Sequence, residues 1–330
     1  MSQRRLRTIA SALALAAAAS LLAMWALTLG SLQLSFADVA RSFFGADGFA
    51  AEVVREWRAP RVVGSLVFGA ALGIAGALFQ TITRNPLGSP DIIGFSAGSY
   101  TGVILARTIL AGSFLSDSLG ALLGGFATAA GVYLLSYRGG IAGSRLIVVG
   151  IGATAMLSSI NTWLLLRARQ EVALGAAMWG AGSINLASWS DVASPLVLLA
   201  ASIPLLCAAL RPLRQLELGD DVAAAHGLRV EPTRLGILGL GVALTAAVTA
   251  AAGPISFVAL AAPQIARRTA RGAGIPIFHS ALTGAIILLA ADMIGQHVPA
   301  QPVPAGAVTV IFGGLYLLWY LIGEGHRRGR

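Results

Sequence analysis

Ten apolar segments, separated by short polar connections, run through this chain of 330 residues. A helix needs roughly 20 mostly apolar residues to cross a bilayer, and 56% of this chain is hydrophobic while 11% is charged. Because a soluble domain carries about 25% charged residues, an ordinary soluble protein is excluded. The sequence predicts a polytopic, all-α membrane protein with about ten transmembrane helices in a single domain, 1–330. The segments lie near residues 9–29, 61–80, 92–111, 117–136, 146–166, 193–210, 235–252, 256–268, 280–297 and 305–322.

Two of these segments need a separate interpretation. The first follows three arginines and resembles a signal peptide, but it is longer than the usual apolar region of roughly 7–15 residues. We therefore expect a retained first helix. The eighth begins after Gly253-Pro254 and is too short for a full span. We expect a short or partly re-entrant helix, which a membrane protein tolerates only where it is buried in protein.

The basic residues are all arginine, 23 in number, and they give a formal net charge of +9. With a cytoplasmic N-terminus, 16 of them fall in inside segments and 7 in outside segments. Positive charge accumulates on the cytoplasmic side of membrane proteins, so we expect both termini in the cytoplasm and no nucleic-acid partner. A nucleotide-binding P-loop needs a lysine. Since the chain has none, it is not itself a P-loop ATPase.

Groups for catalysis or metal binding are sparse. The single cysteine, Cys207, lies in an apolar segment, and the four histidines are not in metal-ligand spacing. We therefore expect no enzyme activity, no metal site and no cofactor bound by this chain. Asp292 lies deep in the ninth segment without a clear partner in the sequence. It is either a packing or capping group, or a proton relay of a proton-coupled secondary transporter.

Two polar segments border the second apolar segment. Residues 58–61 read Arg-Ala-Pro-Arg, so the arginines either anchor the chain at the interface or present two cations to an acidic partner outside. Residues 80–94 read QTITRNPLGSPDIIG. This composition is typical of an ordered, stiff turn, although a simple helix break is the alternative.

Two further polar segments lie in the second half of the chain. In residues 217–230, Gly219-Asp220-Asp221 is typical of the start of a short helix, and Gly227 of its end. Such a helix would be a docking element for a cytoplasmic partner, and a solvated loop is the alternative. In residues 253–268, two prolines interrupt the apolar run. This pattern indicates either a broken helix near a substrate path or a kinked structural helix.

In their order along the chain, these motifs resemble the iron-siderophore and cobalamin ABC permease family, the FecCD type. The resemblance extends from about Ser31 to Leu321 and is greatest toward the ferric-enterobactin branch. It includes RNPLGSPDIIGFSAG at 84–98, NTWLLLRA at 161–168, Trp-Gly-Ala-Gly-Ser at 179–183, LGDDVAAAHG at 218–227 and GPISFVALAAP at 253–263.

The resemblance implies a transport subunit of the cytoplasmic (inner) membrane, built from two inverted structural halves. It implies import of a ferric siderophore, with an enterobactin-like catecholate favoured and with cobalamin or haem as the alternative cargo. The implied partners are a second homologous permease, giving a heterodimer, and two copies of an ABC ATPase that bind ATP and Mg. A siderophore-binding lipoprotein or periplasmic protein would deliver the cargo.

The resemblance also implies roles for individual residues. Arg58 and Arg61 would dock the binding protein, and Gly143 and Ser144 would lie at a cytoplasmic gate. The ATPase coupling loop would comprise Leu218, Gly219, Asp220, Asp221, Ala223, Gly227 and Leu228, and the structural motif residues would be Gln80, Arg84, Asn85, Pro86, Gly253 and Pro254. Several positions depart from the family pattern, and two of them carry polar side chains. Gln264 replaces a histidine, and Gln296 replaces an arginine that would be a third docking cation.

Overall fold

The computed structural model describes residues 3–45, 47–110, 114–137, 143–270 and 275–328, in which every regular element is a helix. The elements are α1 (Gln3–Thr28), α2 (Phe36–Phe43), α3 (Phe49–Glu52), the π-helix η1 (Val53–Arg58), α4 (Ala59–Thr83), the 3-10 helix η2 (Pro90–Ile93), α5 (Phe95–Leu110), α6 (Phe114–Ser136), α7 (Gly143–Arg167), α8 (Gln170–Gly180), α9 (Trp189–Glu217), α10 (Asp220–Ala225), α11 (Val230–Ala252), α12 (Val258–Ala270), α13 (Ile277–His297) and α14 (Ala305–Arg328).

Each of the ten predicted apolar segments coincides with one of these helices. Within the described parts of the chain, 7 helical stretches are long and apolar enough to cross a membrane. They are α1, the continuous run from α3 through α4, α6, α7, α9, α11 and α13. The polytopic, all-α membrane class is therefore confirmed. The full number of ten spans stays a prediction, because α5 has 16 residues, α12 has 13, and the side chains of α14 are described only over Ala305–Trp319.

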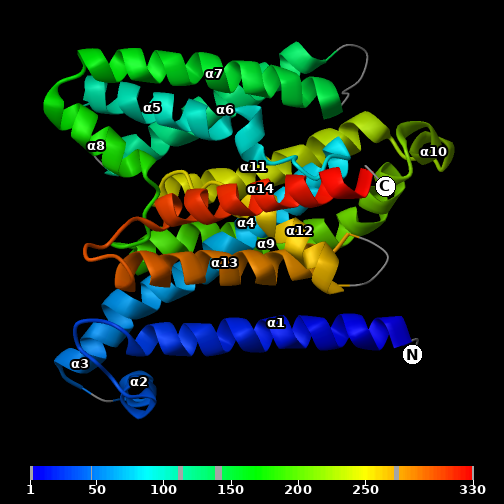
Figure 1. Ribbon diagram of the computed structural model, residues 1–330. Coiled ribbons are helices and arrows are strands. Elements are labelled where there is room, and N and C mark those ends of the chain that lie inside the picture. Colours follow the sequence, from blue (N-terminus) through cyan, green and yellow to red (C-terminus); the bar gives the residue numbers. More distant parts are fainter. Residues whose placement is uncertain (1–2, 46, 111–113, 138–142, 271–274, 329–330) are drawn as a thin grey trace.

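The long helices run side by side between two ends of the molecule (Figure 1). One end, which we call the α10 end, holds α10, the start of α1 and the end of α14. The opposite end, which we call the α3 end, holds α2, α3 and the end of α13. The first and last helices thus have their outer termini on the same side, as an even number of crossings requires. Which side faces the cytoplasm stays a prediction.

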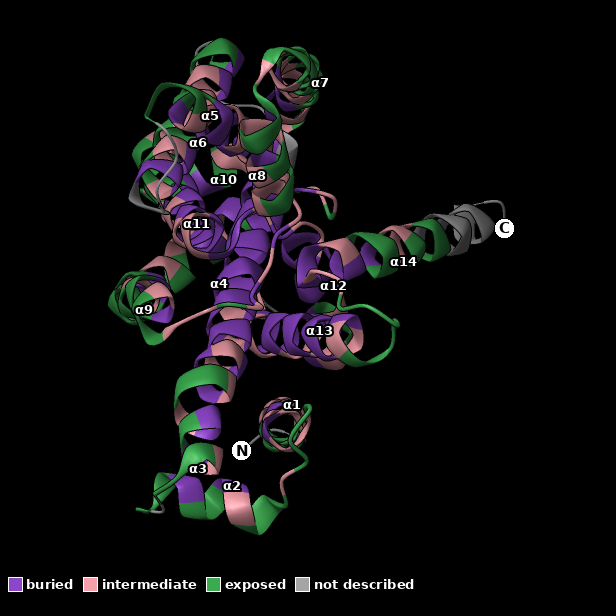
Figure 2. Ribbon diagram, turned by 90° about the vertical axis from the view of Figure 1, so that its left-hand side faces the viewer, coloured by how far each residue is buried: buried purple, intermediate pink, exposed green. Residues whose placement is uncertain are grey.

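Helix α4 lies at the centre and is buried over most of its length (Figure 2). Its glycines allow close contact with α13 and α12. A Cβ at Gly69 would lie 2.3 Å from the carbonyl oxygen of Gly284, and one at Gly73 would lie 2.1 Å from that of Ser280. Small residues permit such contacts where lipid provides no hydrophobic drive for helix association. The small residues of α4 therefore serve packing within this chain.

The start of α4 differs from the prediction. The sequence placed the beginning of the second span near residue 61, but an unbroken helical run extends back to Phe49. Pro60 lacks an N–H group and would clash with the carbonyl four residues earlier in a regular α-helix. The π-helix η1 widens this turn, and the N–H group of Ala59 bonds the carbonyl of Val54, five residues back. Arg58 and Arg61 are thereby held on a helix rather than in a loop.

Candidate functional sites at the two ends of the bundle

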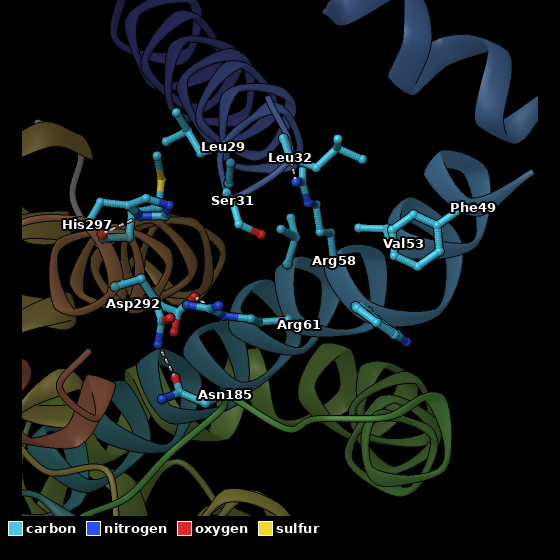
Figure 3. A pocket seen from close by; sticks show the side chains of 16 residues that line it. Leu29, Ser31, Leu32, Phe49, Val53, Arg58, Arg61, Asn185, Asp292 and His297 are labelled. Carbon is cyan, nitrogen blue, oxygen red and sulfur yellow. Dashed lines mark hydrogen bonds and ion pairs between the residues drawn. The ribbon is translucent and has the colours of Figure 1, made fainter. Parts of the chain in front are cut away.

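A hollow of about 420 Å³ opens at the α3 end between α4, α13 and the segment after α1 (Figure 3). We call it the α3-end hollow. Its polar lining comes from residues far apart in the sequence, namely Ser31, Arg58, Arg61, Asn185, Asp292, Gln296 and His297. The two arginines predicted to dock a partner therefore lie in one site, together with the buried aspartate that the sequence left unexplained.

Arg61 forms an ion pair with Asp292. Its Nε–H group donates to Oδ2 of Asp292 at 2.8 Å, and the exposed fractions of the two side chains are 22% and 4%. The other carboxylate oxygen of Asp292 is buried and has no hydrogen-bond partner among the described residues. The aspartate thus has a partner that the sequence did not reveal, since 231 positions separate the two residues and no spacing rule covers such a distance.

Arg58 closes the end of α1. Its guanidinium donates to the carbonyl of Leu27 at 2.9 Å and also to that of Leu32. Carbonyls in the last turn of a helix have no intrahelical partner and carry partial negative charge. Gly30 makes room for this contact, because a Cβ there would lie 2.7 Å from Arg58 Nη2. Arg58 therefore fastens the chain after α1 to the start of α4.

Gln296 occupies the position where the family pattern has an arginine. Its amide donates to the side-chain oxygen of Asn185, which links α13 to the segment before α9. Beside it, the Nδ1 atom of His297 lies 2.9 Å from the carbonyl oxygen of Met293. The cations of the hollow are thus Arg58 and Arg61, with histidine as the only other basic side chain in its lining.

At the α10 end, the sequence correctly predicts a short helix with glycine boundaries. Gly219 precedes α10 with a φ of 116°, and Gly227 follows it with a φ of 81°. The N–H group of Leu228 bonds the carbonyl of Ala223 at 3.0 Å, and that of Gly227 bonds Ala224 at 2.9 Å. These two bonds form the Schellman motif that ends many helices.

Asp220 fastens α10 to two long helices, α4 and α11. Nη2 of Arg234, on α11, lies 2.8 Å from both carboxylate oxygens, and Arg84, at the end of α4, pairs with the same carboxylate. Arg84 also donates from Nε to the carbonyl of Leu216, on α9, at 3.2 Å. Arg234 is buried and donates to Glu231 at 2.9 Å as well. The first acidic residue of the loop therefore holds α10 in place.

The rest of α10 faces outward. Ala223 is fully buried beneath the helix, whereas Leu218 and Val222 are large apolar side chains with exposed fractions of 63% and 42%. Asp221 is exposed beside them. An exposed apolar pair next to a carboxylate is a suitable contact surface for another protein chain.

The turn after α4 is ordered, as predicted. The side chain of Asn85 accepts a bond from the N–H group of Leu87 at 2.9 Å, and buried Gln80 donates to the carbonyl of Leu260 at 3.0 Å. Gln264, on α12, donates to the carbonyl of Pro86 at 2.7 Å. The sequence indicated Gln264 only as a departure from the family pattern. The structure shows that this glutamine ties α12 to the turn.

The predicted gate residues lie against the same turn. A Cβ at Gly143 would lie 2.6 Å from the carbonyl oxygen of Thr83, so the start of α7 packs on the end of α4. Ser144 is exposed. Residues 138–142, which precede them, lie outside the described residues. A gating role for Gly143 and Ser144 stays a prediction.

Gly253 and Pro254 lie where two motifs meet in space. A Cβ at Gly253 would lie 2.3 Å from the carbonyl oxygen of Trp179, and one at Gly182 would lie 2.2 Å from that of Pro254. The N–H group of Gly306, at the start of α14, bonds the carbonyl of Gly182 at 2.9 Å. The break between α11 and α12 is therefore a close backbone junction that only glycine permits.

The comparisons with known proteins define the class. The family model of the FecCD transport family matches residues 16–323, so the chain belongs to that family. The chain is 44% identical over 329 residues to the ferric enterobactin transport system permease protein FepG of Escherichia coli (strain K12), with 98% of each chain covered. It is 34% identical over 310 residues to the achromobactin transport system permease protein CbrC of Dickeya dadantii (strain 3937), covering 91% of this chain and 87% of the other.

A solved structure supports the same assignment. An inward-facing metal-chelate type ABC transporter superposes with a TM-score of 0.83 at 26% identity, covering 95% of this chain and 98% of the other. Together these findings confirm that the chain is a multi-pass transport subunit of the cell (inner) membrane and not an enzyme.

Proposed function

We propose that this chain is the permease subunit of an ATP-driven importer for a ferric siderophore, with an enterobactin-like catecholate complex as its cargo. The observation that carries this proposal is the 44% identity to FepG over almost the full length of both chains. Cobalamin and haem, which the resemblance left open as cargo, are less well supported, because the two relatives described above are named for ferric enterobactin and achromobactin.

The partners follow from the two ends of the molecule. We propose that the α10 end faces the cytoplasm and docks an ABC ATPase, which binds ATP and Mg. The exposed surface of α10 with Leu218, Asp221 and Val222 supports this contact. Two ATPase copies and a second, homologous permease would complete the assembly as a heterodimer, in which the chain faces a non-identical partner.

Motion of α10 would reach the centre of the bundle through Asp220. Its carboxylate bonds Arg84 at the end of α4 and Arg234 on α11, so α10 cannot shift without displacing one of these helices. A transporter must populate its outward and inward states in turn, so the free energies of the two states differ by only about a few kcal/mol. A push on α4, which contacts α9, α11, α12 and α13, is suited to shift that balance.

At the opposite end, Arg58 and Arg61 would receive acidic side chains of the siderophore-binding protein. The hollow of about 420 Å³ between them and α13 has room for such side chains. Charge complementarity at an interface increases the rate of encounter and fixes its orientation. The arginines would therefore select the binding protein, and cargo specificity would rest largely on that partner.

Reconstitution in liposomes tests the proposal. The chain, its second permease, the ATPase and the binding protein encoded with them would be assembled, and uptake of radioactive iron as ferric enterobactin would be measured. We expect uptake that requires both ATP and the binding protein. Uptake of labelled cobalamin in place of ferric enterobactin would contradict the cargo assignment.

A proton-coupled secondary transporter through Asp292 predicts a different result. In that case, liposomes that contain this chain alone would accumulate solute under an imposed proton gradient. The ion pair between Asp292 and Arg61 gives the aspartate a structural role without proton transfer. We therefore expect no uptake by the single chain.

A further inference from the structure

The ion pair between Arg61 and Asp292 is incompletely satisfied. One carboxylate oxygen of Asp292 accepts from Arg61 at 2.8 Å, and the other is buried with no hydrogen-bond partner among the described residues. A buried acceptor without a partner loses its hydration without compensation. The pair also borders the α3-end hollow, and Arg61 keeps 22% of its side chain exposed there. The aspartate is therefore enclosed, whereas its arginine remains within reach of an incoming group.

We infer that Asp292 competes with the acidic side chain of the docking partner for Arg61. In the undocked permease Asp292 holds this arginine, and on docking the partner's carboxylate displaces it. This inference rests on the proposed importer function. It assigns to Asp292 the control of how strongly the binding protein is held.

The two arginines of the hollow are engaged in different ways. Arg58 donates to carbonyl oxygens, which are uncharged, and among the described residues no carboxylate forms an ion pair with it. A guanidinium has more N–H donors than these two bonds use. Arg61, in contrast, is paired with a carboxylate. Arg58 can therefore bind an acidic side chain of the partner at any time. Arg61 can do so only when Asp292 releases it.

Release of Arg61 would also loosen a junction between helices. Arg61 lies on α4 and Asp292 on α13, and the same two helices pack tightly at Gly69 and Gly284 further along. The ion pair is their polar connection at the α3 end (Figure 3). Exchange of the carboxylate partner would thus transmit docking of the binding protein to the central helix.

Substitution of Asp292 tests the inference. The complete importer would be placed in nanodiscs, and the dissociation constant of its own binding protein would be measured for the wild type and for Asp292→Asn. The amide keeps the shape of the side chain but removes the competing charge. We expect binding about tenfold tighter, in line with coupling energies of close charge pairs. Adding Arg61→Gln to Asp292→Asn should abolish the gain. Unchanged or weaker binding by Asp292→Asn would overturn the inference.

A matched control lies on the same end of the molecule. Asp38 pairs with Arg41 on α2 in an exposed ion pair at 3.3 Å. Asp38→Asn frees an arginine just as Asp292→Asn does, but away from the hollow. We expect no change in the dissociation constant. A tenfold gain here as well would mean that any added positive charge strengthens docking, and the specific role of Asp292 would be refuted.

A measurement without substitution of Asp292 covers the case in which Asp292→Asn does not assemble. Spin labels would be attached at Glu56→Cys, just before α4, and at Val298→Cys, just after α13, where both side chains are exposed. With the native cysteine removed by Cys207→Ser, the labels report the distance between α4 and α13 at the α3 end. We expect this distance to increase when the binding protein is added. If the distance is unchanged in a complex that transports, the inference is overturned and the proposed function stands. If the wild type shows no uptake that depends on the binding protein, the proposed function itself is contradicted.

Discussion

Two ion pairs, one at each end of the molecule, have opposite patterns of exposure. At the α3 end, the acid is enclosed and the cation is partly reachable, with exposed fractions of 4% for Asp292 and 22% for Arg61. At the α10 end, the cation is enclosed and the acid is reachable, with 4% for Arg234 and 45% for Asp220. The Arg61–Asp292 pair therefore presents a partly exposed cation and the Arg234–Asp220 pair a partly exposed acid, each next to a buried group of opposite sign.

The number of partners also differs between the ends. Asp292 has one cation, whereas Asp220 is shared by Arg84 and Arg234 and so joins α4 to α11. A competing carboxylate can displace Asp292 by replacing a single ion pair. Asp220 is held by two arginines, so both ion pairs must break before it moves. This difference teaches that similar salt bridges can serve a switch at one end and a rigid connection at the other.

The largest effect is expected where a buried charge loses its only partner. Arg61→Ala leaves Asp292 enclosed and unpaired, and loss of one partner of a buried pair costs about 3–5 kcal/mol. We expect a clear fall in the thermal midpoint of the purified complex, and the intrinsic tryptophan fluorescence of the complex would measure this midpoint.

The neutral pair is the control for this prediction. Arg61→Gln combined with Asp292→Asn removes both charges, so it should recover most of the lost stability. If Arg61→Ala were as stable as the wild type, the assignment of Asp292 as a buried, singly paired acid would be wrong.

A smaller effect is expected at the joint on the α10 end. Asp220→Ala removes the shared carboxylate, but Arg234 keeps its contact with Glu231, and Asp220 is partly screened by solvent. Hydrogen bonds to charged groups contribute about 1.5–3 kcal/mol, and we expect the lower part of that range. The main expected result is functional, since ATP hydrolysis by the assembled importer should continue with little transport. Glu217→Ala, at an exposed acid at the end of α9, is the matched control, and equal uncoupling by both variants would contradict the special role of Asp220.

The cap of α10 gives a weaker test of the same joint. Gly227 has a φ of 81°, and a residue with a Cβ adopts this left-handed region at a cost of roughly 1–2 kcal/mol. Gly227→Ala should therefore lower transport and ATPase coupling in part, with a small shift of the thermal midpoint. Gly236→Ala is a suitable control, because that glycine lies in α11 with nothing within 4 Å of an added Cβ. A loss of coupling that is greater for Gly236→Ala would contradict this prediction.

The helices could be predicted from the sequence because each apolar segment carries its own signal. Residues 217–230 were equally clear, since the glycines around α10 and the acids at its start act locally. The short helices α2 and α8 were missed, because neither forms a separate apolar segment of membrane length. The extension of α4 back to Phe49 was also missed, since Pro60 reads as a helix start unless the wide turn before it is known.

The candidate sites were predictable only in part, for a physical reason. Arg58, Arg61, Asp220 and Asp292 stand out in the sequence as polar groups near apolar segments. Their partners do not, because the contacts join helices that lie far apart in the chain, by 231 residues for Arg61 and Asp292 and by 136 for Arg84 and Asp220. The pairing depends on the packing of the whole bundle, and one sequence without the fold does not contain a rule for it.

The smallest effect is expected at Arg41, and it tests whether exposure alone makes an arginine a docking group. Arg41 has an exposed fraction of 71% and pairs with Asp38 three residues earlier. Hydrogen bonds from the side chain and the backbone of Ser35 lower the pKa of Asp38, so the pair is ionised at neutral pH. Exposed ion pairs contribute little to helix stability because solvent screens them, so Arg41→Gln should leave the thermal midpoint almost unchanged. Binding-protein affinity should also stay within error, because a docking cation must be held in a fixed position beside the hollow. Strong loss of binding in Arg41→Gln, with little loss in Arg58→Gln, would move the docking surface from α4 to α2.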